Sequence, residues 1–579
     1  MKEKTFHLIL IKPSHYDDDG YVIQWLRSSI PSNSLAALYG MAQDCSRRKV
    51  LGDGVEIVLS VYDETNTRIR VKEICERINK SGSKGLVGLV GVQTNQYPRA
   101  VDIARQFLSE GVPVCIGGFH VSGCLSMLPG VPADLQEAMD EGISLFAGEV
   151  EEGRLGSLLQ EAYSGKMKPL YNYMDDLPNM EGEPVPYLPV EKIKKTAGLR
   201  ASFDAGRGCP FLCSFCTIIN VQGHKSRYRS ADDVEEIMRA NVAQGIENFF
   251  ISDDDFARNR NWEAIFDRLI KLREEEGLSL RFVIQVDTMC HKIPRFIDKA
   301  ARAGVTRVFI GMESINPDAL KGAKKKQNRI AEYNVMLDAW HKAGALTYAG
   351  YILGFPTDTP ESILRDIKTI QEKISIDVME FFILTPLPGS EDHQTLYKKG
   401  VKMATDMNEY DVVHVTTAHA TMTDREWLDI YHQAWEAYYT PEHVEKVIRR
   451  AKGWGFSTRE MMLKLLSFYG CAKIEKVHPL EGGFIRLKFR RDRRPGKPIE
   501  NSLVFYPRYL GETLKKVVQY FWMVRQYKKI VRKVDQEPSM PPEELKVLPV
   551  QDEDQKVHPP WEGTDPRNIL DKKEDKVLT

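Results

Sequence analysis

The sequence, 579 residues long, lacks both an excess of charge and a long hydrophobic run. Its 80 lysine and arginine residues are matched by 81 aspartate and glutamate residues, so the overall charge does not indicate a nucleic-acid partner. No apolar stretch reaches the roughly 18 residues that a membrane span requires. The N-terminal residues Met1–Lys4 lead into a strand-like run, not into the apolar core of a signal peptide. These absences predict a large cytoplasmic enzyme that does not act on nucleic acid.

Cysteine is also scarce. Nine cysteines in a chain of this length indicate reduced thiols in an intracellular protein, not a disulfide framework. Six are scattered, and no second C-x2-C or C-x3-C indicates an auxiliary cluster: Cys45, Cys75, Cys115, Cys124, Cys290 and Cys471. Free cysteines of this kind usually pack as small buried hydrophobic residues. The other three lie within eight residues of one another, and the functional prediction depends on them.

These three cysteines, Cys209, Cys213 and Cys216, have the spacing C-x3-C-x2-C. Three thiolates on one tight loop can hold three irons of a [4Fe–4S] cluster and leave the fourth iron open. The alternative is a zinc site, which needs a fourth ligand, and His224 is the only candidate nearby. The three-cysteine spacing favours the iron–sulfur cluster.

Before this motif, apolar runs alternate with amphipathic stretches, which predicts an α/β, Rossmann-like, doubly wound domain over residues 1–165. The expected strands are Phe6–Ile11, Val55–Val61, Gly85–Val92, Val112–Ile116 and Ser144–Ala147. Such domains bind ligands at the carboxyl ends of their strands. Residues 166–195 are expected to form a linker.

A second set of six strands, separated by helical patterns, predicts a partial (β/α)6 barrel over residues 196–400. The expected strands are Ala201–Ala205, Asn248–Ser252, Arg281–Asp287, Arg307–Gly311, Tyr348–Gly354 and Val378–Thr385. By analogy with complete barrels, functional groups are expected at the carboxyl ends of these strands. The cysteine loop directly follows the first strand.

The cysteine loop, together with polar residues at successive strand ends, resembles the radical SAM superfamily. The resemblance implies that S-adenosylmethionine (SAM) binds the open iron and is reductively cleaved to a 5′-deoxyadenosyl radical. It also implies a set of SAM-binding residues at the strand ends: Phe215, Asp253, Asp254, Gln285, Glu313, Ser314 and Gly354. Each could instead have a purely structural role, such as an acidic residue at a helix N-terminus.

Three N-terminal segments resemble the cobalamin-binding domain of one class of radical SAM proteins: Gly-Val-Gln-Thr-Asn95, Ile-Gly-Gly-Phe-His-Val-Ser122 and Ala-Gly-Glu-Val-Glu151. The implied corrinoid contacts are His15, Gln93, Thr94, Asn95, Gly117, Gly118, His120, Gly148 and Glu149. The D-x-H-x-x-G motif of cobalamin-binding proteins is incomplete, since only its histidine, His15, is present. A sheet with ordinary glycine turns is the alternative.

Residues 401–500 resemble the C-terminal extension of the same class, and residues 401–534 are expected to form a mixed, α-rich cap over the barrel. Within them, residues 510–534 form a basic amphipathic pattern with Tyr520, Phe521, Trp522 and Val524 on its apolar side. Such a helix can lie on a membrane surface or pack on the domain with its lysines in water. Residues 535–579 are expected to be a disordered tail.

The resemblance implies cobalamin-dependent methylation of an unactivated carbon, with electrons from a flavodoxin or ferredoxin. The expected substrate is a small molecule, for which a lipid or a natural-product scaffold is a candidate. Ring closure or rearrangement without methyl transfer is an alternative reaction. A corrinoid-binding sensor with a degenerate barrel is a second alternative. Methylthio transfer is disfavoured because Cys45, Cys75, Cys115 and Cys124 do not form an N-terminal cluster motif.

Overall fold

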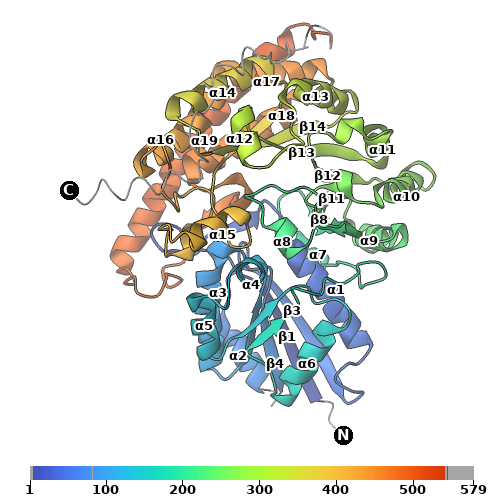
Figure 1. Ribbon diagram of the computed structural model, residues 1–579, viewed down its shortest axis with the longest axis vertical. Coiled ribbons are helices and arrows are strands. Elements are labelled where there is room, and N and C mark those ends of the chain that lie inside the picture. The colour runs from blue at the N-terminus through green and yellow to red at the C-terminus, as the bar shows by residue number, and fades with distance from the viewer. Residues whose placement is uncertain (1–3, 81–82, 542–543, 545–579) are drawn as a thin grey trace.

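The computed structural model describes residues 4–80, 83–541 and 544. Its N-terminal part is a six-stranded sheet of order β3-β1-β4-β5-β6-β7, and every neighbouring pair is parallel (Figure 1). The strands are β1 (Lys4–Lys12), β3 (Val55–Asp63), β4 (Lys84–Leu89), β5 (Val114–Gly117), β6 (Ser144–Ala147) and β7 (Leu170–Asn172). The predicted doubly wound fold is confirmed, with the reversal of strand order between β1 and β4.

Alternate residues of β1 face opposite sides of this sheet, as the pleat of a strand requires. Phe6, Leu8 and Leu10 belong to the core under α1 (Asn33–Arg47) and α6 (Arg154–Ser164). Ile9 and Ile11 belong to the core on the other face, under α2 (Val71–Lys80), α3 (Tyr97–Ser109), α4 (Phe119–Met127) and α5 (Ala133–Asp140). The sheet is therefore buried on both faces, which leaves its strand ends to contact ligands or the rest of the protein.

The second sheet contains six parallel strands in chain order, each beside its neighbour in sequence. They are β8 (Arg200–Phe203), β11 (Asn248–Ile251), β12 (Arg281–Val286), β13 (Val305–Glu313), β14 (Leu346–Leu353) and β15 (Val378–Ile383). The connecting helices are α9 (Ala231–Ala243), α10 (Trp262–Glu274), α11 (Phe296–Ala303), α13 (Tyr333–Lys342) and α14 (Pro360–Lys373). All six predicted strands are confirmed. Within the described residues β8 and β15 do not pair, so the barrel is open.

Side-chain caps fix where two of the barrel helices begin. The Ser230 hydroxyl accepts a hydrogen bond from the Asp233 amide at 3.0 Å, which starts α9. The Thr359 hydroxyl accepts one from the Ser362 amide at 3.2 Å, which starts α14. In both cases the third helical residue also bonds back to the cap, forming a capping box. These caps fix the residue at which each helix begins after the preceding strand.

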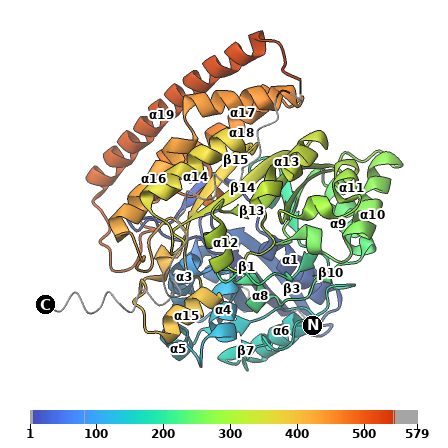
Figure 2. The same cartoon turned by 45° about the horizontal axis from the view of Figure 1, so that its top comes forward.

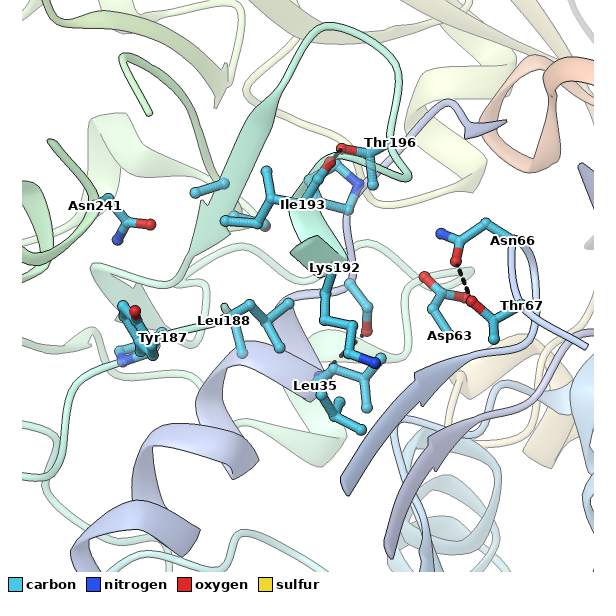
Figure 3. Close-up of a pocket in the computed structure, with 17 residues that line it drawn as sticks. Leu35, Asp63, Asn66, Thr67, Tyr187, Leu188, Lys192, Ile193, Thr196 and Asn241 are labelled. Carbon is cyan, nitrogen blue, oxygen red and sulfur yellow. Dashed lines mark hydrogen bonds between the residues drawn. The ribbon is translucent and has the colours of Figure 1, made fainter. Parts of the chain in front are cut away.

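The predicted linker, residues 166–195, begins with β7, which extends the N-terminal sheet, and then packs between the two sheets. Figure 3 shows Tyr187 and Ile193 of this stretch between Leu35 of α1 and Asn241 of α9. The space left there is about 30 Å³. Such a volume accommodates a water molecule or two and no cofactor.

The C-terminal region contributes four helices, of which two pack on β15 and the last packs on the outside of the two before it (Figures 1 and 2). They are α16 (Asp424–Tyr438), α17 (Pro441–Gly453), α18 (Thr458–Gly470) and α19 (Ser502–Gln536). A short strand, β16 (Gly483–Leu487), then pairs antiparallel with β2 (Gln24–Ser28) of the N-terminal part. Neither of these two strands was predicted, because each gains its partner only through a contact more than 400 residues away in the chain.

Helix α19 confirms the predicted basic amphipathic helix, but only part of its apolar surface packs on the protein. The residues buried against the neighbouring helices are Phe505, Tyr527, Ile530 and Val534. Phe521 and Trp522, expected on the apolar side, are 59% and 61% exposed. None of the helices in the described ranges is both long and apolar enough to cross a membrane. Of the predicted tail, residues 542–543 and 545–579 lie outside the described residues.

Candidate active site

The three clustered cysteines lie on a loop whose base is closed by a short β-ladder. Strand β9 (Gly206–Arg207) pairs antiparallel with β10 (Arg227–Tyr228), and the cysteines lie between these strands. Gly208 adopts φ +88°, and a Cβ there would lie 2.5 Å from the Lys225 carbonyl oxygen. Glycine is therefore required at the first bend of this loop.

The thiols influence one another electrostatically. Burial raises the pKa of Cys209 and of Cys216 to about 12, and the neighbouring Cys213 contributes to both shifts. Gln327 Nε2 donates to Cys213 Sγ at 3.5 Å. Without a cation the thiols of Cys209 and Cys216 stay protonated at neutral pH, whereas bound iron would displace their protons.

Three neighbouring thiols on one loop fit a cluster that binds each sulfur through a separate iron. Within the described part of the chain, no three His, Cys, Asp or Glu side chains come close enough together to hold one metal ion.

Two predicted SAM contacts, Asp253 and Asp254, follow β11 but face different surroundings. Asp253 Oδ1 accepts from the amides of Ala205 and Gly206 at 2.7 and 2.9 Å, and its Oδ2 accepts from Asn259 Nδ2 at 2.9 Å. Burial nevertheless raises the pKa of Asp253 to about 7. Asp253 therefore fixes the turn that leads into the cysteine loop. Asp254 is exposed and lies near enough to Cys216 to raise the pKa of that thiol.

A further acidic pair, not predicted as a site, lies beside the cysteine loop. The Asp287 amide donates to Asp255 Oδ1 at 3.3 Å, and Arg258 donates to both oxygens of Asp287 at 2.6 and 3.0 Å. Burial raises the pKa of Asp255 well above its ordinary value, and Asp287 adds to this shift. Asp255 in turn contributes to the raised pKa of Cys209. Asp254 and Asp255 thus place two carboxyl groups near the cysteine thiols.

Glu313 and Ser314, at the end of β13, lie beside a buried lysine that the sequence did not single out. Lys325 forms an ion pair with Glu313, and its Nζ lies 5.7 Å from the centre of the Phe215 ring. Burial alone would lower the pKa of Lys325, but Glu313 and then Cys213 raise it overall. Ser314 is buried, and its hydroxyl accepts from the amide two residues later at 3.0 Å. Glu313, Phe215 and the thiols therefore share one polar neighbourhood.

Gly354 and Gln285 complete the predicted SAM set. Gly354 has φ +101°, and a Cβ at this position would lie 2.0 Å from the Trp427 ring. Its amide donates to Asp358 Oδ2 at 2.9 Å. Packing alone thus explains the glycine. Gln285 Nε2 donates to the Asp253 carbonyl oxygen at 3.2 Å, and Gln285 also lines the large cavity of the barrel, together with Phe215.

Four of the predicted corrinoid contacts line one cavity of about 170 Å³ at the strand ends of the N-terminal sheet: Gly117, Gly118, Gly148 and Glu149. The cavity extends between the sheet and α1 and α6, where its walls are mostly apolar, and it reaches Arg207 of the cysteine loop. A Cβ on Gly91, which also lines it, would lie 2.4 Å from Ser34 Oγ. Glycines at these strand ends allow close approach of a ligand to the backbone.

The other five predicted corrinoid contacts do not line this cavity: His15, Gln93, Thr94, Asn95 and His120. His120 is fully buried, with Nε2 2.9 Å from Asp134 Oδ2. Asn95 and His15 meet at Glu481 of the C-terminal region, at 2.7 and 3.4 Å. Gln93 is exposed. Four of the predicted residues thus line the cavity, whereas Asn95 and His15 contact the C-terminal region.

Arg207 connects the cysteine loop to the N-terminal sheet through three carboxylates. Its Nε donates to Asp204 at 2.7 Å, its Nη1 donates to Glu149 at 2.6 Å and its Nη2 lies 2.7 Å from Glu151. Arg227 also contacts Glu149, at 2.5 Å. The sequence gives one signal for this network: an arginine stands between two glycines just before the first cysteine.

We expect Arg207→Gln to lower the free energy of unfolding by about 3–5 kcal/mol, because it leaves buried carboxylates without their cation. Chemical denaturation monitored by circular dichroism measures this change. Arg239→Gln, which removes a surface ion pair with Glu235, should change stability little. Equal stability of the two variants would contradict the importance assigned to the network.

The same network predicts an acid sensitivity. Burial by itself raises the pKa of Glu149 and Asp204, but Arg207, together with Arg227 at Glu149 and Arg229 at Asp204, outweighs burial and lowers both pKa values. A carboxylate whose pKa is lowered in the folded state stabilises the protein at pH values above its unfolded-state pKa of about 4. This stabilisation is lost as the pH falls below that value. The wild type should therefore lose more stability than Arg207→Gln between about pH 7 and pH 3.5. A larger loss in the variant would contradict this assignment.

Comparisons with known proteins agree with this geometry. Residues 204–370 match the family model described as the Radical SAM superfamily. The bacteriochlorophyllide d C-12(1)-methyltransferase of Chlorobaculum tepidum is 29% identical over 331 residues, which cover 56% of this chain and 68% of that enzyme. The C-8(2)-methyltransferase of the same organism is 24% identical over 355 residues, covering 59% and 74%.

Among solved structures, the radical SAM methyltransferase TsrM from Kitasatospora setae, with cobalamin and a [4Fe-4S] cluster bound, has a similar fold. The TM-score is 0.55 at 16% identity, and the match covers 80% of this chain and 99% of TsrM. This likeness concerns the fold. Residues 204–370, which contain the cysteine loop after the first barrel strand, therefore form a radical SAM domain.

Proposed function

We propose that this protein is a cobalamin-dependent radical SAM methyltransferase acting on a small molecule. The observation that carries the proposal is the junction at Arg207, which joins the three-cysteine loop to the strand ends that line the glycine-rich cavity. When bound, a [4Fe–4S] cluster with an open iron supplies the electron that cleaves SAM, and a corrinoid supplies a carrier for the methyl group. The named methyltransferases among the relatives support the same reaction.

The overall reaction replaces one substrate C–H bond by C–CH3 and consumes two SAM molecules. One SAM gives its methyl group and leaves as S-adenosylhomocysteine. The other is cleaved to methionine and a 5′-deoxyadenosyl group, which takes the substrate hydrogen and leaves as 5′-deoxyadenosine. The two electrons required would come from a flavodoxin or ferredoxin. Counting methyl groups in the product distinguishes this reaction from ring closure or rearrangement.

The residues around the cysteine loop would bind and orient SAM. Asp254 and Asp255 offer carboxylates near the cysteines, which suits the cationic amino group of a methionine moiety. Lys325, paired with Glu313, offers a cation for the carboxylate of that moiety. Phe215 offers an aromatic face next to Lys325. Asp255 and Lys325 are buried, which would keep water away from the reacting groups on their side of the site.

Cys213→Ala should abolish both cluster binding and formation of 5′-deoxyadenosine, because only two thiolates would remain on the loop. The measurements are the visible spectrum of anaerobically reconstituted protein and mass spectrometry of its products after reduction with dithionite and addition of SAM. Cys290→Ala, a buried cysteine outside the loop, is the control and should retain both properties. Cleavage of SAM by Cys213→Ala at the wild-type rate would contradict the proposal.

Ala37→Phe should weaken corrinoid binding at least tenfold, because the added ring would fill the 170 Å³ cavity that Ala37 lines. Titration with hydroxocobalamin, followed by the spectrum of the bound corrinoid, measures this effect. Ala133→Phe, at an exposed position of α5, is the matched control. Corrinoid binding to Ala37→Phe with wild-type affinity would show that this cavity is not the corrinoid site.

We further propose that α19 binds an anionic membrane surface through its exposed apolar side. Leu503, Leu510, Leu514 and Val518 precede Phe521 and Trp522 along the helix, and all six are more than half exposed. The helix carries eight basic and two acidic residues, which complements anionic lipid: Arg508, Lys515, Lys516, Arg525, Lys528, Lys529, Arg532 and Lys533 against Glu512 and Asp535. Apolar burial and this charge act together in interfacial helices.

The double variant Phe521→Glu, Trp522→Glu should lose binding to vesicles that contain phosphatidylserine, as measured by co-sedimentation. Val335→Glu provides a matched control, because Val335 is 61% exposed on α13. The wild type should bind these vesicles more strongly than neutral phosphatidylcholine vesicles, since the helix is basic. Unchanged binding of the double variant, or equal binding to both vesicles, would exclude this surface.

A further inference from the structure

The interior of the open barrel contains a cavity of about 700 Å³ whose polarity changes along its length. Because side chains alternate along a strand, every second residue of the barrel strands faces inward. The layer nearest the cysteine loop includes Phe215, Ile352 and Leu384. The middle layer includes Phe250, Phe309 and Phe382. The far layer, near the beginnings of the strands, is polar and includes Arg200, Asn248, Arg307 and Tyr348.

Three cations meet at this far end. Arg200 is the first residue of β8, Arg307 is near the start of β13, and Lys464 comes from α18, which covers this end of the barrel. Arg307 pairs with Glu460 at 2.8 Å. In the described ranges no ion pair involves Arg200 or Lys464, and Arg200 Nε is buried with no hydrogen-bond partner.

The electrostatics of this group are those of cations that face one another. Burial lowers the pKa of Lys464 to about 8, and Arg307 and Arg200 contribute to the shift. Burial lowers the pKa of Arg200 to about 10, with a contribution from Arg307. Glu380, which also lines the cavity, does not neutralise them, because burial raises its pKa to about 8 and keeps its carboxyl protonated near neutral pH. An anion placed among these side chains would relieve the repulsion and the missing hydrogen bond.

We propose that Arg200, Arg307 and Lys464 bind the anionic group, a carboxylate or a phosphate, of an elongated apolar substrate. The inference rests on the proposed function and names its substrate class. The aromatic middle layer would surround the apolar body of the molecule. The end of the molecule opposite its anionic group would reach the cysteine loop. From Tyr348 to Leu353, five steps of about 3.3 Å give about 17 Å along β14 between the far layer and the carboxyl end of the strand.

Gly350 lets the aromatic rings of the middle layer lie close against β14. It is the inward-facing residue of β14 in the middle layer, where a Cβ would lie 2.9 Å from the Phe382 ring and 3.2 Å from the Phe309 ring. In a closed eight-stranded barrel the inward side chains fill the interior in layers. Here the edge between β8 and β15 is open, and a cavity extends from the cations to Phe215 of the cysteine loop.

The test uses three probes of equal chain length: a long-chain alkyl carboxylate, the matching alkyl phosphate and the uncharged alcohol. Their binding to the reconstituted wild-type protein is measured by isothermal titration calorimetry. At least one anionic probe should bind tenfold or more tightly than the alcohol. The anion that binds more tightly identifies the head group as carboxylate or phosphate. Equal affinity for the alcohol and both anions would overturn the proposal.

Charge variants then locate the binding group. Arg200→Gln and Lys464→Gln should each weaken anion binding at least tenfold without weakening alcohol binding, whereas Arg200→Lys should restore part of the affinity. Lys271→Gln, on the exposed side of α10, is the matched control. If both glutamine variants bind the anion as tightly as the wild type, the anion does not bind at Arg200 and Lys464. Thermal unfolding identifies any variant that fails to fold. Failure of the wild type to cleave SAM would contradict the proposed function and leave the probe titrations unaffected.

Discussion

The position of the cysteine loop depends on one buried guanidinium. Arg207 directs each of its three nitrogens at a different carboxylate, of which Asp204 follows the first barrel strand and Glu149 and Glu151 follow the sixth strand of the chain. Burying such charges costs several kcal/mol per ion unless they are paired with good geometry. The ends of β6 and β8 must therefore meet correctly before the loop can form. The cysteine spacing determines what the loop can bind, whereas Arg207 determines where the loop lies relative to the N-terminal sheet.

That placement brings the carboxyl ends of both parallel sheets to a common boundary. In each sheet these ends are where open α/β folds and barrels place their ligands. The N-terminal sheet contributes glycines at this boundary, so its backbone borders the cavity directly, and the barrel contributes Asp254, Asp255 and Glu313. Two ligands bound on either side would be adjacent without any further domain movement. One ion-pair network thus makes a reaction that needs two cofactors geometrically feasible.

The sequence predicted what depends on local pattern and missed what depends on distant partners. Strand and helix alternation and the cysteine spacing are local, and the eleven strands predicted from them are present. The pairing of β2 with β16 and the contact of His15 with Glu481 join residues more than 400 positions apart, which no local pattern encodes. Asp253 shows the limit within the site. Its place at a strand end was correct, but only the fold reveals that its oxygens accept hydrogen bonds from Ala205, Gly206 and Asn259.

The barrel interior contains functional candidates that the sequence did not single out. Arg200 and Arg307 are separated by a hundred residues, and in the sequence each resembles an ordinary charged residue at the start of a strand. The parallel sheet aligns the starts of its strands, and α18 then adds Lys464 to the same end of the cavity. Burying Arg200 without a counterion opposes folding. A protein that needed only a stable core would gain by replacing Arg200 with an apolar residue. Its presence beside a passage that leads to the cysteine loop is explained if the counterion arrives with the substrate.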